Sequence, residues 1–332
     1  MGSSLASPGM RRVVIHEFGS LDDLVVVEAP DLEPAPGQVV VDVEAAGVNF
    51  VDGLIVQGRY QFTPPLPHTP GTEVAGRVAA LGDGVDGLVV GQRVLALPST
   101  GGYASQVVVP APAAVPIPDT ITAGQAAGLV QSYATMLYAF TRRTAVTAGE
   151  WIAVLGAGGG VGLAATDLGT VLGAQVVACA SSPDKLALAT AAGATATIAY
   201  EDTDLKTAIR DVTGGGADAI VDPVGGAKAE SALRSLRWEG RYLVIGFAAG
   251  DIPRFPINQI LLNSRTVIGI ELGGWVRRDP AGYHALIGEL MELVAAGRLH
   301  PVEPLARPLA EAPQLLADLQ SRAVAGKAVL TP

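Results

Sequence analysis

The chain has 332 residues, of which 49% are hydrophobic and 16% charged, with 41 glycines and 23 prolines. This length favours two domains, and the composition is typical of a compact α/β protein rather than a disordered one. A formal net charge of -10 argues against nucleic acid and anionic membranes as partners. The single cysteine, Cys179, excludes an intrachain disulfide and any multi-cysteine zinc site. It is typical of a reducing compartment, so we expect a cytoplasmic protein.

The first segment, MGSSLASPGM, lacks the charged and apolar parts of a secretory signal. We therefore expect residues 1–9 to be an N-terminal extension without a role. Residues 120–141 carry no charge, yet they include Gln125, Gln131 and Ser132, which predicts buried helix and loop rather than a membrane span.

From Met10 to about Pro118 the chain offers short β-rich runs separated by Gly, Pro and Asp turns. These runs are residues 13–18, 24–29, 38–48, 73–82, 92–97 and 104–110. The pattern predicts a compact, partly barrel-like β domain.

After Thr122, short apolar strands alternate with helix-length segments. We expect strands at 151–157, 175–181, 195–200, 218–224, 240–247 and 266–272, and helices at 161–172, 184–192, 204–213 and 227–236. The alternation predicts a doubly wound parallel sheet with its ligand at the carboxyl ends of the strands. A helix at about 280–296 and the closing GKAVLTP are expected to rejoin the first domain.

The segment AGGGVG, residues 157–162, follows one predicted strand and opens a helix. In that context Gly159 would let the backbone approach a dinucleotide pyrophosphate, and Gly162 would let the helix pack against the strand. We predict that the whole loop binds the cofactor: Ala157, Gly158, Gly159, Gly160, Val161 and Gly162. Ala157 stands where the usual fingerprint has its first glycine, and a flexible surface loop is the alternative interpretation.

The end of the second predicted strand, ACASSPDKL, indicates which nicotinamide cofactor binds. Ser181 and Ser182 are neutral donors and Lys185 adds a positive charge, which favours NADPH over NADH. Asp184 is a competing signal, although it follows Pro183, where it can cap the next helix. In the alternative interpretation the serines cap the helix and Lys185 is solvated.

Several motifs, in order along the chain, resemble the zinc-independent quinone oxidoreductases among the medium-chain dehydrogenases/reductases. They include AAGVNFVDGLIVQGRY, PLPHTPGTEVAGRVAALG, ATMLYAF, VLGAGGGVGLAA, ASSPDKLALA, TIAYEDTDL, GRYLVIGFAAG and GKAVLTP. The resemblance implies a GroES-like, partly open β-barrel catalytic domain at 10–130 and 271–332, and a Rossmann NADPH-binding domain at 131–270. It also implies a homodimer.

Zinc-dependent members of that superfamily hold a catalytic metal through cysteine and histidine side chains. The matching places here carry Asn49, Thr72 and Gln131, none of which supplies a thiolate or an imidazole. We therefore expect no metal site.

The resemblance also assigns roles to individual residues. Asn49 would lie beside the nicotinamide as a catalytic and cofactor-binding residue. Many relatives have a tyrosine where this chain has Leu54, and its loss makes the pocket more apolar and weakens the case for a tyrosine proton donor. Tyr60 remains a candidate proton donor, with a packing role as the alternative. The remaining expected cofactor contacts are Thr135, Tyr200, Val224, Gly246, Phe247, Ala248 and Arg322. Tyr200 would meet the adenosine 2′-phosphate, unless it is merely a half-buried strand residue.

The leading hypothesis is metal-independent, NADPH-dependent hydride transfer to quinones or activated enones. A rival is an enoyl-thioester reductase, in which Arg142 and Arg143, or Arg277 and Arg278, would bind a coenzyme A phosphate. Another is an NADPH-binding sensor with little turnover.

Overall fold

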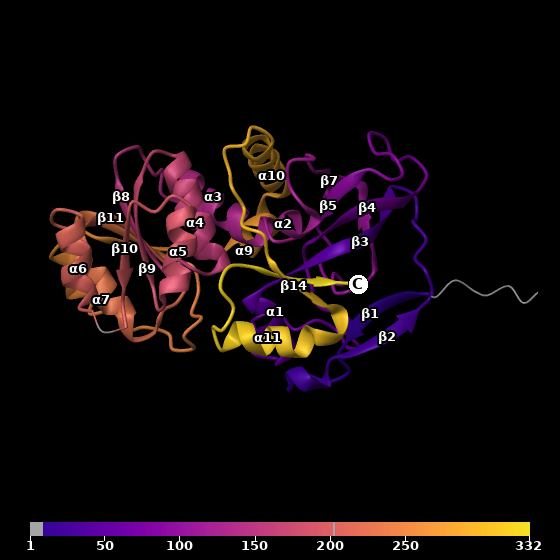
Figure 1. Cartoon of the computed structure of the whole chain (residues 1–332), viewed down its shortest axis with the longest axis horizontal. Helices are drawn as coiled ribbons and strands as arrows, with labels where there is room; N and C mark the ends of the chain where they lie inside the picture. Colours follow the sequence, from indigo (N-terminus) through magenta and orange to yellow (C-terminus); the bar gives the residue numbers. More distant parts are fainter. Residues whose placement is uncertain (1–8, 202) are drawn as a thin grey trace, which may run out of the picture. The chain divides into compact units, whose positions relative to one another are not determined.

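The computed structural model describes residues 9–201 and 203–332. The expected N-terminal extension lies almost wholly outside the described residues. The chain divides into two compact units, one formed by the chain up to Leu129 together with Val302–Pro332, the other by Val130–Pro301. Figure 1 shows the first in indigo, purple and yellow and the second in magenta to orange.

The first unit is built on a seven-stranded sheet of order β14-β15-β3-β4-β5-β7, in which β6 also pairs with β3. Its strands are β3 (Gln38–Val48), β4 (Val74–Leu81), β5 (Arg93–Ala96), β6 (Gln106–Pro110), β7 (Ala114–Pro116), β14 (Leu305–Pro308) and β15 (Ala328–Thr331). A separate antiparallel pair consists of β1 (Met10–Val14) and β2 (Val25–Ala29). Five of the six expected runs contain strands over most of their length, and β3 coincides with its prediction. The run expected at 13–18 shares only Val13 and Val14 with β1, which begins earlier, at Met10.

Alternating apolar residues of these strands form one core, which includes Val39, Val41 and Val43 of β3.

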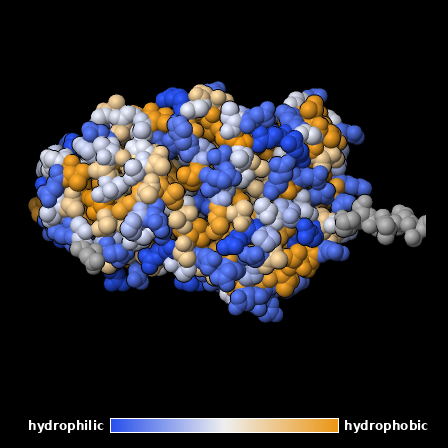
Figure 2. Space-filling view, viewed as in Figure 1, coloured by the Kyte–Doolittle hydropathy of each residue, from blue (hydrophilic) through white to orange (hydrophobic). Residues whose placement is uncertain are grey.

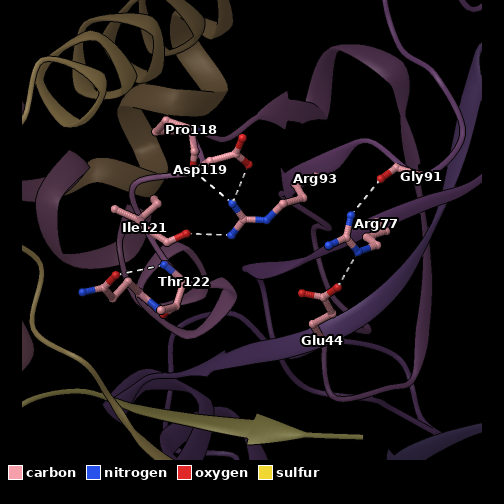
Figure 3. A network of polar contacts seen from close by, with 9 residues as sticks. Glu44, Arg77, Gly91, Arg93, Pro118, Asp119, Ile121 and Thr122 are labelled. Atoms are coloured by element: carbon pink, nitrogen blue, oxygen red, sulfur yellow. Dashed lines mark hydrogen bonds and ion pairs between the residues drawn. The ribbon is translucent and has the colours of Figure 1, made fainter.

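Arginine side chains on the sheet form hydrogen bonds with neighbouring segments of the chain (Figure 3). Arg93 on β5 donates to the carbonyl oxygens of Pro118 and Ile121, at 3.2 and 2.6 Å. These bonds fix the segment that leads into α2 (Ala123–Ala127).

Two further helices belong to this unit, α1 (Phe50–Val56) and α11 (Ala312–Gln320), and they pack against each other. The start of α1 is set by Asp52, whose carboxylate accepts a hydrogen bond from the backbone N–H of Asn49 at 2.9 Å. This reciprocal bond satisfies a donor that the first turn of a helix would otherwise leave unpaired.

The second unit contains a six-stranded sheet of order β10-β9-β8-β11-β12-β13. Its strands are β8 (Trp151–Leu155), β9 (Gln175–Ala180), β10 (Ala196–Ala199), β11 (Ala217–Asp222), β12 (Leu236–Val244) and β13 (Thr266–Gly269). All neighbouring strands are parallel. The connecting helices are α4 (Gly160–Val171), α5 (Pro183–Ala191), α6 (Leu205–Val212) and α7 (Ala229–Ser235). This strand order is the doubly wound arrangement that the sequence predicts.

The uncharged stretch before β8 is helical, as expected, and includes α3 (Thr135–Tyr138) between π-helical segments at Val130–Ala134 and Ala139–Arg143. A short α8 (Asn258–Leu261) precedes β13, and α9 (Leu272–Arg278) and α10 (Pro280–Ala295) follow it. The strand expected at 266–272 therefore ends early. The Glu271 side chain accepts from the Gly274 N–H and starts α9 instead.

The unit boundaries also differ from the expected domain boundaries. Residues 271–301, expected to belong to the β-rich domain, lie in the second unit. The reason is packing within that unit, because α10 contacts α9, α3 and the π-helical segment at Val130–Ala134. Trp275 of α9 also stacks on Tyr138 of α3, with ring centroids 4.5 Å apart.

Within the described ranges, no helix combines the length and apolar character needed to cross a bilayer. Figure 2 shows hydrophobic residues scattered among hydrophilic ones over the face in view.

Candidate functional site

The glycine-rich loop of the second unit joins the carboxyl end of β8 to the first turn of α4. Gly156 has a φ of 59°, a value that favours glycine. A Cβ at Gly162 would lie 2.3 Å from the Gly156 carbonyl oxygen and 2.6 Å from Ala157 Cα. Only glycine lets the helix come this close to the loop, which is the packing role that the sequence predicts for Gly162.

Gly159 has a different environment, which fits a ligand. It is the N-cap of α4, with no side-chain cap, and the nearest atom to a Cβ placed there would be the Gly156 carbonyl oxygen at 3.5 Å. The first-turn N–H groups of a helix have no partner within the helix and carry partial positive charge. The residues present therefore fit a pyrophosphate, whose oxygens would occupy the space that a side chain on Gly159 would fill.

Gly158 is required for a reason that the sequence did not reveal. A Cβ at this position would lie 2.4 Å from the Lys185 Cβ. Lys185 is therefore packed directly against the loop, which supports its expected place at the cofactor site. Ser182 is the N-cap of α5 but makes no side-chain cap, and Asp184 lies in the first turn rather than at the cap position. The hydroxyl of Ser182 is thus not used to start the helix.

Loops after β11 and β12 border the same edge of the sheet. The Val224 side chain would lie 2.8 Å from a Cβ on Gly156, so Val224 contacts the glycine loop. The Ala248 N–H donates to the Pro223 carbonyl oxygen at 3.1 Å. The structure therefore brings together the glycine loop, Val224 and the segment Gly246–Ala248, as the doubly wound fold predicts.

Tyr200 follows β10 and is mostly buried, with 9% of its surface exposed, in the hydrophobic cluster of this unit. Its carbonyl oxygen accepts a hydrogen bond from Lys228 Nζ at 2.6 Å. Sequence reasoning missed Lys228, because the only signal for it is its place six residues after the end of β11.

Thr135 is buried at the start of α3, where its hydroxyl donates to the Gln131 carbonyl oxygen at 2.6 Å. The hydroxyl proton is therefore committed inside the helix. Only the oxygen lone pairs of Thr135 remain for a ligand, so its expected role is restricted to accepting a hydrogen bond.

In the first unit, Asn49 lies in a buried cluster of polar side chains rather than in an ordinary turn. Asn49 Nδ2 donates to Glu73 Oε1 at 3.0 Å, and Lys327 Nζ donates both to Asn49 Oδ1 and to Glu73 Oε1, the latter at 3.0 Å. Lys327 and Glu73 form a deeply buried ion pair, since their side chains are 9% and 2% exposed. These bonds fix the amide orientation of Asn49 and leave one N–H and one lone pair for a ligand.

Asp52 extends this cluster. Its Oδ2 accepts from the Tyr103 hydroxyl at 2.8 Å as well as from the Asn49 N–H. Burial raises the pKa of Asp52 from 3.8 to about 6, although the two hydrogen bonds and Lys327 oppose the rise. Burial, together with Asp52, raises the pKa of the Tyr103 hydroxyl well above 10, so this hydroxyl stays protonated.

Two glycines make room for the buried ion pair. A Cβ on Gly47 would lie 2.7 Å from Glu73 Oε1, and one on Gly128 would lie 2.8 Å from Lys327 Cγ. Sequence reasoning missed Glu73 and Lys327 as site residues, although both belong to motifs that carried the resemblance. Each is a charged residue immediately before a strand, Glu73 before β4 and Lys327 before β15, and this position alone does not distinguish a buried ion pair from two solvated charges.

The remaining expected site residues stay predictions. Tyr60 is half-buried shortly after α1, Leu54 lies on α1, and Arg322 follows α11 with a φ of 62°. Among the positions compared with zinc ligands, Asn49 and Thr72 lie in the first unit and Gln131 in the second. Within residues 9–201 and 203–332, no group of three or more His, Cys, Asp or Glu side chains is arranged to hold a metal ion.

Comparison with known proteins relates both units to described families. A model of the alcohol dehydrogenase GroES-like domain matches residues 35–119, and a model of the zinc-binding dehydrogenases matches residues 160–289. The mouse (Mus musculus) protein named quinone oxidoreductase-like protein 2 is 36% identical over 84% of this chain and 80% of its own length.

Solved structures agree with this relationship. The Escherichia coli quinone oxidoreductase, crystallised as a complex with NADPH, is 30% identical, with a TM-score of 0.85 over 97% of this chain and 100% of that one. The CurK enoyl reductase is 25% identical, with a TM-score of 0.87 over 97% of this chain and 99% of that one. These matches confirm the predicted fold class, a GroES-like domain with a Rossmann domain. The chain therefore belongs to the quinone oxidoreductase-like family of the medium-chain dehydrogenases/reductases.

Proposed function

We propose that this protein is an NADPH-dependent oxidoreductase that reduces quinones or activated enones without a metal. The observation that carries the proposal is the glycine loop, where the space beside Gly159 faces the start of α4 and Lys185 packs against Gly158. The similarity to a quinone oxidoreductase crystallised with NADPH supports the choice of cofactor.

NADPH would supply the hydride that the reaction transfers. The amide groups at the start of α4 bind the pyrophosphate, and Ser181 and Lys185 bind the adenosine 2′-phosphate. Lys185 contributes a positive charge there, and no acidic side chain stands at the place of Ser181 to repel the phosphate.

At the reacting end, Asn49 would present its remaining N–H to a carbonyl oxygen of the nicotinamide or the acceptor. Lys327 and Glu73 hold this amide in one orientation, so no reorganisation is needed when the ligand arrives. Tyr60 would donate a proton to the acceptor oxygen after reduction. Positioning of two reactants in this way can lower a barrier by about 7 kcal/mol in favourable systems.

Metal independence is part of the proposal. It is supported by the neutral side chains of Asn49, Thr72 and Gln131 at the positions that resemble zinc ligands. Turnover that persists after chelation would support it, and one tightly bound zinc ion per chain, required for activity, would contradict it.

Reduction of an enoyl thioester is a second candidate, favoured by the similarity to the CurK enoyl reductase. The arginines expected to bind a coenzyme A phosphate give it little support. Arg142 pairs with Glu289, Arg143 donates to the Gly269 carbonyl oxygen, and Arg278 donates to the Gly274 carbonyl oxygen. Three of the four guanidinium groups are therefore engaged within the unit.

A panel of acceptors tests the proposal directly. NADPH oxidation is followed with one para-quinone, one simple enone and one short enoyl thioester, each with a chelator present. We expect quinone or enone turnover to dominate. Turnover of the thioester alone would establish the second candidate instead, and NADPH binding without turnover of any acceptor would indicate a sensor.

A further inference from the structure

Lys228 lies beside the adenosine end of the proposed cofactor site and is held there by several contacts. Its Nζ donates to the carbonyl oxygens of Tyr200 and Glu201, at 2.6 and 3.3 Å. The same ammonium lies 5.9 Å from the centre of the Tyr200 ring. The Lys228 side chain is half-buried, so this position is defined by packing as well as by hydrogen bonds.

A glycine-rich turn with a fixed backbone precedes Lys228. Gly225 and Gly226 have φ values of 67° and 64°, which only glycine adopts readily. The Asp222 carboxylate accepts from the N–H groups of Val224 and Gly225, both at 2.8 Å, and from the Tyr242 hydroxyl. These bonds fix the turn after β11, and Lys228 follows directly in the 3-10 turn Gly226–Lys228.

Tyr200 connects Lys228 to the carboxyl end of β9, where the proposed 2′-phosphate site begins. The Tyr200 N–H donates to the Ala180 carbonyl oxygen at 3.2 Å, and Ala180 is the last residue of β9. Ser181 follows it immediately. The ammonium of Lys228 thus binds the backbone at Tyr200, and the N–H of the same residue pairs with the strand end that immediately precedes Ser181.

The charge of Lys228 has no acidic partner among the described residues, because no ion pair of this lysine occurs there. A lysine ammonium has three N–H donors, and two carbonyl oxygens account for two of them. We propose that Lys228 is a specificity residue for NADPH, which directs its third N–H and its positive charge to the adenosine 2′-phosphate. This inference rests on the proposed function and adds a second cation to Lys185.

Binding measurements on Lys228→Met test this inference without relying on turnover. We expect the Kd for NADPH to rise about tenfold, the loss expected for one charge-assisted hydrogen bond, while the Kd for NADH changes little. Binding of adenosine 2′,5′-bisphosphate should weaken by a similar factor to binding of NADPH. Binding of adenosine 5′-monophosphate, which lacks the 2′-phosphate, should not change. Lys228→Arg, which keeps the charge, should retain most of the discrimination between NADPH and NADH.

Lys206→Met is the matched control, since it removes one exposed lysine from α6 of the same unit. It should leave both Kd values unchanged. Equal weakening of NADPH and NADH by Lys228→Met would show that Lys228 only supports the Tyr200 backbone, and no change in either would also overturn the inference. Failure of the wild-type protein to bind NADPH would instead contradict the proposed function, so the two failures are distinguishable.

Discussion

Asp52 is the buried residue whose protonation should influence the stability of the first unit. Its pKa is about 6 in the folded chain against 3.8 for an ordinary aspartate, so the folded state binds the proton more tightly than the unfolded state. Stability from this group is therefore present below about pH 4 and is lost as pH rises through 6. The loss should total about 3 kcal/mol, at 1.4 kcal/mol for each pH unit between the two pKa values.

Asp52→Asn keeps an oxygen that can accept from Asn49 and Tyr103 but cannot ionise. We expect the difference between the unfolding midpoint of the variant and that of the wild type to increase from pH 4 to pH 7, because only the wild type loses stability over this range. Chemical denaturation at several pH values checks this. An identical pH dependence for both proteins would show that Asp52 does not titrate in this range.

The ion pair between Lys327 and Glu73 should be costly to break from one side. Lys327→Met leaves the buried Glu73 carboxylate without its cation, and we expect a loss of about 3–5 kcal/mol in stability. The double variant Lys327→Met with Glu73→Met removes both charges and should recover most of it. A matched control is Arg77→Met, which breaks an exposed pair with Glu44 and should cost less than about 1 kcal/mol. Recovery that fails in the double variant would contradict this account.

In the loop between β8 and α4, substitution of one glycine should affect NADPH affinity and substitution of another should affect stability. Gly159→Ala meets no atom closer than 3.5 Å, so the fold should keep its melting temperature while NADPH affinity falls at least tenfold. Gly162→Ala meets backbone atoms at 2.3 Å, so it should lower the melting temperature. Calorimetry and NADPH titration of the two variants separate these effects. Unchanged NADPH affinity in Gly159→Ala would contradict the proposal that the pyrophosphate binds at this loop.

Elements with a clear apolar period could be predicted from the sequence, and β3 coincides with its expected residues 38–48. The start of α9 could not, because Ile270 and Leu272 continue the apolar strand pattern on either side of Glu271. Only the hydrogen bond from the Gly274 N–H to the Glu271 side chain reveals the helix start. The polar cluster around Asn49 also could not be predicted from the sequence. Lys327 and Glu73 are 254 positions apart, and no local pattern joins them.

At the scale of the whole molecule, we propose a homodimer formed through the edge strand β13. In the sheet of the second unit, β13 pairs only with β12 among the described strands. Large apolar side chains close to it in sequence are exposed, including Ile257 at 76%, Leu261 at 77% and Leu262 at 65%. An unpaired edge strand with apolar neighbours favours association with a second copy.

Leu261→Glu places a charge in this apolar surface and should shift the protein from dimer to monomer. Light scattering after size-exclusion chromatography measures the change, and Val89→Glu, at an exposed apolar residue of the first unit, is the control. A wild-type protein that is monomeric at all concentrations would contradict the proposed dimer.

The central claim is that this protein reduces its acceptor with NADPH and without a metal. The most direct measurement compares kcat/KM for NADPH and for NADH with a para-quinone, in protein treated with a chelator. We expect turnover to survive chelation and to be at least tenfold more efficient with NADPH, because a cationic site for the 2′-phosphate discriminates by one charge-assisted contact or more. Equal or better use of NADH would contradict the assignment of the phosphate site, and activity lost on chelation and restored by zinc would contradict the mechanism.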